Sequence, residues 1–141
     1  MADIDDVHFP DPTERVPTIL VVDDEVLIRM VLSDYLQDCG FKVLEAGTVA
    51  EAIAIIEAGT TILDLVFSDV NMPGGKDGIE LAQWIKTNRP QLPVLLTSGD
   101  EKKAEMAGAI CAKEEFLPKP YDHKAAVARV RTLIKARRRS L

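Results

Sequence analysis

Short apolar runs alternate with longer amphipathic segments along almost the whole chain, and this alternation is the feature that most restricts the fold. The runs lie at residues 19–22, 42–46, 65–68, 94–97 and 116–119. Short aliphatic runs such as 19–22 are typical of strands that are buried on both faces. Strands that alternate with helices predict right-handed βαβ crossovers and a parallel sheet. We therefore expect an α/β fold, with five strands and five helices in a doubly wound arrangement.

The segments between the runs have the three- and four-residue apolar spacing of amphipathic helices. In the first helix, the face expected to be apolar consists of Leu27, Ile28, Val31, Leu32, Tyr35, Leu36 and Cys39. A weaker helix is expected at about 102–112. In the last helix, Val127, Val130 and Ile134 are expected to face the sheet. Basic side chains of that helix are expected to point towards solvent, namely Arg131, Lys135 and Arg138.

The length of 141 residues is that of about one domain. Residues 1–17 are acidic and contain three prolines, so they predict a flexible arm before a folded domain at 18–138. Residues 139–141 are assigned to a basic tail. The net charge of −6 and a pI of about 4.9 argue against a general nucleic-acid binder, although the C-terminal end is basic.

The sequence contains no segment that predicts export or membrane insertion. The aliphatic run Ile19–Val22 is far too short to cross a bilayer, and the acidic N-terminus does not resemble a signal peptide. Cys39 and Cys111 match no metal-binding spacing, so both are expected to be reduced thiols. We therefore expect a cytoplasmic protein.

Polar residues follow four of the expected strands at their carboxyl ends, where doubly wound folds form their sites. Asp23 and Asp24 follow the first strand, and Asp69 follows the third. Ser98 and Lys119 follow the fourth and fifth strands. Taken alone, Asp24 could instead cap the next helix. Together, however, the three aspartates would repel one another unless a cation joined them.

These residue types suit a site that accepts a phosphoryl group. Mg²⁺ prefers carboxylate oxygens, water and phosphate oxygens as ligands. A carboxylate beside such an ion can attack phosphorus and form an aspartyl-phosphate. Lys119 and the hydroxyl of Ser98 can then bind oxygens of the transferred group.

Four motifs closely resemble those of a response-regulator receiver domain, across about residues 18–138. The motifs are Ile19–Glu25, Asp69–Pro73, Pro93–Gly99 and Phe116–Pro120. Each motif alone is weak, but together their order and spacing are highly specific. The resemblance implies a flavodoxin-like (βα)5 fold with strand order 2-1-3-4-5.

The resemblance also implies a role for each matching residue. Asp69 is expected to accept the phosphoryl group, and Lys119 to assist it. The ligands expected for Mg²⁺ are Asp23, Asp24, Asp69 and the backbone carbonyl of Asn71. Ser98, rather than Thr97, and Phe116 are expected to be the switch residues. The bond between Lys119 and Pro120 is expected to be cis.

The expected function is that of a stand-alone switch in two-component or phosphorelay signalling. A histidine kinase or a phosphotransfer protein would phosphorylate Asp69, and the output would be contact with a downstream protein. The short sequence after the last helix leaves no room for a DNA-binding domain, so direct DNA binding is not expected. The chain would assist its own phosphorylation and dephosphorylation without being an enzyme.

Two alternatives remain open. A phosphohydrolase with an aspartyl-phosphate intermediate would need a second acid two residues after Asp69, where the chain has Asn71. A phosphorylation-independent interaction module would not need the intact set of Asp23, Asp24, Asp69 and Lys119.

Overall fold

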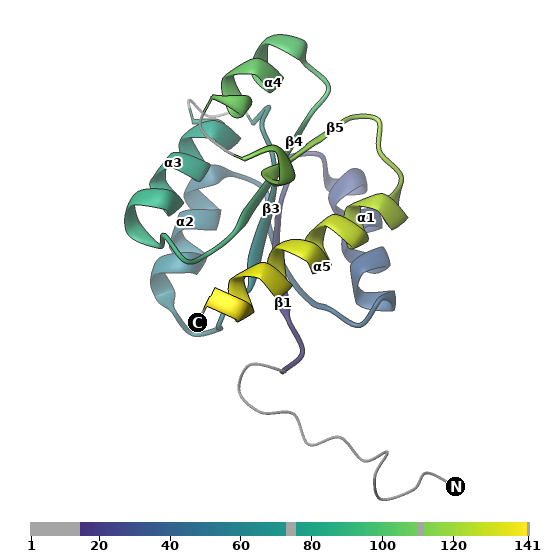
Figure 1. The fold of residues 1–141 in the computed structure, drawn as a ribbon, viewed down its shortest axis with the longest axis vertical. Helices are drawn as coiled ribbons and strands as arrows, with labels where there is room; N and C mark the ends of the chain where they lie inside the picture. Colours follow the sequence, from purple (N-terminus) through teal and green to yellow (C-terminus); the bar gives the residue numbers. More distant parts are fainter. Residues whose placement is uncertain (1–14, 73–75, 110–111, 141) are drawn as a thin grey trace, which may run out of the picture.

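A parallel five-stranded sheet forms the centre of the molecule (Figure 1). The computed structural model describes residues 15–72, 76–109 and 112–140. The strands are β1 (Thr18–Val22), β2 (Lys42–Ala46), β3 (Leu65–Asp69), β4 (Val94–Ser98) and β5 (Phe116–Pro118). The helices are α1 (Val26–Asp38), α2 (Val49–Ala58), α3 (Gly78–Asn88), α4 (Glu101–Gly108) and α5 (His123–Ser140). The strand order is β2-β1-β3-β4-β5, which confirms the expected fold and order.

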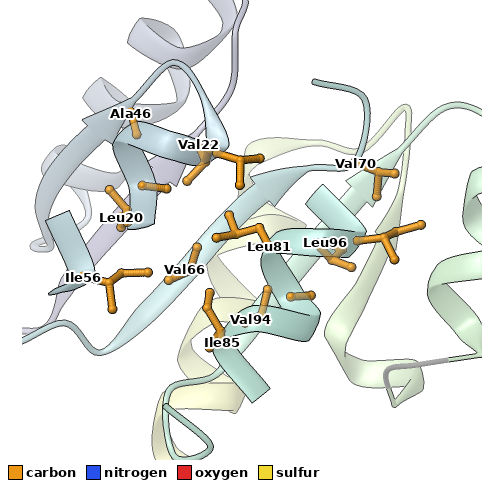
Figure 2. Close-up of a cluster of buried hydrophobic side chains, with 14 of the residues drawn as sticks. Leu20, Val22, Ala46, Ile56, Val66, Val70, Leu81, Ile85, Val94 and Leu96 are labelled. Atoms are coloured by element: carbon orange, nitrogen blue, oxygen red, sulfur yellow. The ribbon is translucent and has the colours of Figure 1, made fainter. Parts of the chain in front are cut away.

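Helices cover both faces of the sheet, because alternate residues of each central strand point to opposite sides. Ile19 and Val21 of β1 belong to a cluster with side chains of α1 and α5. Leu20 and Val22 belong to a second cluster with side chains of α2 and α3. Figure 2 shows this second cluster, and Figure 1 shows the two helix layers on either side of the sheet. Strands β1, β3 and β4 are therefore buried throughout, as their aliphatic sequences predict.

The inward face of α1 differs from the prediction. Leu32, Ser33 and Leu36 are buried, while Leu27, Ile28 and Val31 are exposed. The reason is that the helix carries apolar residues on two faces, and apolar periodicity cannot tell which face meets the sheet. We call four of the exposed apolar residues, Val26, Leu27, Met30 and Val31, the outer apolar face of α1.

The amino end of β3 is tied to both ends of the described chain. Asp64, which immediately precedes β3, has a side chain that is only 2% exposed. Arg15 donates to both of its carboxylate oxygens, at 2.6 and 2.9 Å. From α5, Arg137 and Arg138 approach the same carboxylate at 3.5 and 3.7 Å.

The expectation of a solvated basic helix is therefore wrong for Arg138, because a buried carboxylate attracts it. Arg131 and Lys135 are exposed as predicted, and Val127, Val130 and Ile134 are buried. The helix continues through Arg139 to Ser140, beyond the boundary assigned at residue 138. The arm lies outside the described residues up to position 14.

Helix α4 is shorter than predicted and the least embedded of the helices. It ends at Gly108, and a 3-10 turn at Lys113–Glu115 follows before β5. Ala107 is its one buried residue among those with described side chains. Within the described residues, Cys39 is a free thiol and no helix is long and apolar enough to span a membrane. Cys111 lies outside those residues.

We predict that Asp64→Asn lowers the free energy of unfolding by about 1–3 kcal/mol, because it removes the charge that Arg15, Arg137 and Arg138 share. Urea titration would measure the change. Asp34→Asn, at an exposed position of α1, is the control and should leave the midpoint nearly unchanged. Equal losses in the two variants would contradict a structural role for the cluster.

Candidate functional site

Asp69 lies at the centre of the site, as the last residue of β3. Its side chain is only 5% exposed, and both carboxylate oxygens have partners. The Nζ of Lys119 donates to Oδ2 at 2.9 Å, and the N–H of Asn71 donates to Oδ1 at 3.0 Å. Lys119 reaches this position because its own N–H donates to the Ser98 carbonyl, which joins the ends of β4 and β5. A buried carboxylate and a cationic side chain are thus held together.

Asp23 and Asp24 complete an acidic cluster with Asp69. One carboxylate oxygen from each lies within 4.8 Å of the others. Asp24 is exposed, whereas Asp23 and Asp69 are buried. The helix-capping alternative for Asp24 fails, because Glu25 is the N-cap of α1 and no side-chain hydrogen bond caps this helix.

The pKa of Asp23 is raised above its ordinary value. Burial is the largest cause, and the negative charges of Asp69 and Asp24 add to it. The N–H of Glu25 and the charge of Lys119 oppose this rise only in part. A divalent cation would reduce the repulsion, and carboxylate oxygens are among the ligands that Mg²⁺ prefers. The residues present therefore fit a magnesium ion, while the role of the Asn71 carbonyl stays a prediction.

Of the two expected switch residues, Ser98 lies at the same edge of the sheet as this cluster, whereas Phe116 lies at the start of β5 beside Leu96. Ser98 ends β4, and its Oγ accepts the N–H of Asp100 at 3.0 Å. Thr97 is equally buried, but its hydroxyl has no hydrogen-bond partner. Phe116 begins β5 and is half-buried against the α2–α3 side of the core. The peptide bond between Lys119 and Pro120 is cis, as predicted.

Tyr121 is a site residue that the sequence interpretation did not single out. Its ring contacts Phe67 and His123, with centroids 5.9 and 6.4 Å away. Burial and the nearby charges of Asp23 and Asp69 raise the pKa of Tyr121 to about 12. The phenol therefore remains protonated at neutral pH. The sequence feature that could have identified Tyr121 as a site residue is its position directly after Lys119-Pro120.

Gly78 is a second residue that the sequence interpretation did not single out, and it positions the end of β3. It is the buried first residue of α3, and its N–H donates to the Val70 carbonyl at 2.8 Å. A Cβ at this position would collide with the carbonyl oxygen of Asp69 and the Cα of Val70. Only glycine allows α3 to begin directly against the end of β3.

Comparison with known proteins agrees with this geometry. The family model of the response regulator receiver domain matches residues 19–131, which is most of the chain. The chain therefore belongs to the response regulator receiver domain family.

Individual relatives support the same assignment. The transcriptional regulatory protein AruR of Pseudomonas aeruginosa is 31% identical over 123 residues, which are 85% of this chain and 50% of AruR. The chain thus spans about half the length of curated relatives such as AruR.

Two solved structures have the same fold. A response regulator receiver protein from Sinorhizobium medicae has a TM-score of 0.78 at 28% identity, covering 87% of this chain and 98% of that one. TrrA of Thermotoga maritima, in complex with Mg²⁺-BeF, has a TM-score of 0.73 at 27% identity, covering 84% and 99%.

We predict that Gly78→Ala lowers the free energy of unfolding by about 1–3 kcal/mol, because the new methyl group displaces the backbone of Asp69 and Val70. The loss should be measured by urea titration, together with weaker Mg²⁺ binding by calorimetry. Gly108→Ala is the matched control, because nothing lies within 4 Å of a Cβ there. Unchanged stability and Mg²⁺ binding in Gly78→Ala would contradict the positioning role.

Proposed function

We propose that this chain is a phosphorylation-activated signalling switch that accepts a phosphoryl group on Asp69. The donor is a histidine kinase or a histidine phosphotransfer protein, and the output is contact with a downstream protein. The observation that carries the proposal is the convergence of Asp69, Lys119 and the pair Asp23–Asp24 at one edge of the sheet.

The reaction is a transfer between two protein side chains. An oxygen of the Asp69 carboxylate attacks phosphorus, and a new O–P bond forms. The bond from phosphorus to the donor's imidazole nitrogen breaks, and that nitrogen keeps the electron pair. The positive charge of Lys119 stabilises the negative oxygens of the transferred group.

Mg²⁺ bound by Asp23, Asp24 and Asp69 would supply further positive charge to the phosphoryl oxygens. The complex of TrrA with Mg²⁺-BeF supports a magnesium site in this family. Asp23 must be ionised to act as a ligand. The raised pKa of Asp23 therefore predicts that Mg²⁺ binding weakens as the pH falls.

The surface beside the site favours a protein donor. The outer apolar face of α1 begins at Val26, two residues after Asp24, and Leu27 is 76% exposed. Exposed apolar side chains that share one face of a helix mark a surface that another protein can cover. A small-molecule phosphodonor would have no use for this surface, whereas a helical donor domain could bury it.

The switch depends on the Ser98 hydroxyl, which can interact either with the backbone of Asp100 or with a phosphoryl group on Asp69. In the unphosphorylated protein, the Oγ of Ser98 accepts the N–H of Asp100. Asp100 is the N-cap of α4, where its side chain accepts the N–H groups of Lys102 and Lys103. A phosphoryl oxygen on Asp69 would attract the Ser98 hydroxyl and weaken this cap.

Helix α4 is then the element that changes most, because few of its side chains are buried. Phe116 adjusts its packing at the same time and changes the surface formed by α4, β5 and α5. The change is a population shift between two packings of one fold.

This proposal places the chain in the cytoplasm, outside the class of enzymes that turn over an external substrate. A phosphohydrolase is disfavoured, since Asn71 provides no second acid and its N–H instead donates to Asp69. A phosphorylation-independent interaction module is disfavoured as well, because it would not need the complete set of Asp23, Asp24, Asp69 and Lys119.

The proposal predicts that a small phosphodonor with Mg²⁺ labels Asp69, as mapped by mass spectrometry. Asp69→Asn should abolish labelling because the nucleophile is lost, and chelation of Mg²⁺ should suppress it. Asp34→Asn on α1 is the control and should be labelled normally. Labelling of another residue would overturn the assignment, and steady turnover of a phosphate ester would indicate a phosphohydrolase.

For the switch, we expect Ser98→Ala to accept phosphate at Asp69 but to show a much smaller response in α4 and around Phe116. Amide chemical shifts of residues 100–103 before and after phosphorylation would measure it. Thr97→Val is the matched control, because the Thr97 hydroxyl has no hydrogen-bond partner. A full response in Ser98→Ala would refute the competition described above.

A further inference from the structure

An arginine occupies an inward position of α1, next to the acidic cluster. The buried residues of this helix are Leu32, Ser33 and Leu36, and Arg29 continues their spacing by one turn towards the amino end. Its side chain is only 18% exposed. Apolar periodicity misses this position because the residue is charged.

The guanidinium of Arg29 joins two elements of the sheet region. Its Nη1 donates to the backbone carbonyl of Asp23 at 2.7 Å. Its Nε donates to Oε1 of Glu45, in β2, at 2.9 Å. Gly47 leaves room for this arrangement, because a Cβ there would lie 3.1 Å from Nη1. The planar guanidinium of Arg29 thus donates hydrogen bonds to two separate partners, Asp23 and Glu45.

The backbone of Asp23 is consequently held from both sides. Its N–H donates to the Ala46 carbonyl at 3.1 Å, and its own carbonyl accepts from Arg29. The Oδ1 of its side chain accepts the N–H of Glu25 at 2.9 Å. These bonds orient the carboxylate that faces Asp24 and Asp69, although like charges and burial disfavour it there.

We propose that Arg29, braced by Glu45, is a positioning residue that fixes Asp23 and thereby sets the affinity of the acidic cluster for Mg²⁺. The inference rests on the magnesium site of the proposed function. Groups that orient a metal ligand typically change metal affinity by about ten-fold to a hundred-fold when they are removed.

An electrostatic role and a positioning role of Arg29 predict different Mg²⁺ affinities for its variants, which makes the proposal testable. If Arg29 acted only through its positive charge, its removal would strengthen the binding of a cation. Replacement by lysine would then change nothing. If Arg29 acts by position, both replacements weaken binding, because neither side chain can bond Asp23 and Glu45 in the same geometry.

The experiment is calorimetric titration of the whole chain with MgCl₂. We expect Arg29→Gln and Arg29→Lys each to bind Mg²⁺ about ten-fold or more weakly. Arg131→Gln is the matched control and should bind normally. Arg131 also donates to a backbone carbonyl, that of Cys39, but at the opposite end of α1.

A second readout needs no metal. The amide shift of Asp24, which follows the Asp23 carbonyl, should change in metal-free Arg29→Lys and in Glu45→Ala. Because Glu45 is partly exposed, Glu45→Ala is expected to fold. It therefore tests the role of the Arg29–Glu45 contact even if the Arg29 variants do not fold. An unchanged shift in Glu45→Ala would overturn the proposal.

The remaining outcomes are distinct. Unchanged affinity in Arg29→Lys, or tighter binding by Arg29→Gln, would overturn the positioning role while leaving the magnesium site intact. Failure of the unsubstituted protein to bind Mg²⁺ would overturn the magnesium site and this inference together.

Discussion

Repulsion among three carboxylates is the constraint around which this molecule is arranged. Asp23, Asp24 and Asp69 converge at the carboxyl ends of β1 and β3, and burial makes the charge of Asp23 more costly. Lys119 offsets part of this cost through its ion pair with Asp69. The same unfavourable concentration of negative charge would favour the binding of a cation, as the proposed function requires. The carboxylates that would bind the cation therefore destabilise the folded protein at this edge of the sheet when no cation is bound.

The site is held in place mainly by the backbone, and long-range bonds secure that backbone. Gly78 lets α3 begin against the carbonyl of Asp69, and the Lys119 N–H joins the end of β5 to Ser98. At the other end of the sheet, Asp64 ties β3 to Arg15 and to α5. Strand β3, which carries Asp69, is thus restrained at both ends. Among the described side chains of α4, by contrast, only Ala107 is buried in the core, and this contrast makes α4 the element that the proposed switch would change most.

The two apolar faces of α1 serve different purposes. Leu32 and Leu36 fill the core, while Leu27, Met30 and Val31 remain exposed beside the acidic cluster. An exposed apolar face is unfavourable for an isolated domain, so it is consistent with a surface that a partner covers. In the proposed function, the phosphodonor is the partner that would cover this face, which lies close to Asp23 and Asp24 in the sequence.

The alternation of aliphatic runs and helical segments determined the parallel sheet, and family motifs determined its order. Polar residues at strand ends could be placed together from sequence alone, because parallel strands end at one edge. Tertiary structure decided which face of α1 is buried, and it brought Arg29 to Glu45 and Arg15 to Asp64. It also decided that Gly78 touches the backbone of Asp69. These contacts join residues that are separated in the sequence, and no local sequence pattern predicts them. They are therefore defined only once the chain is packed.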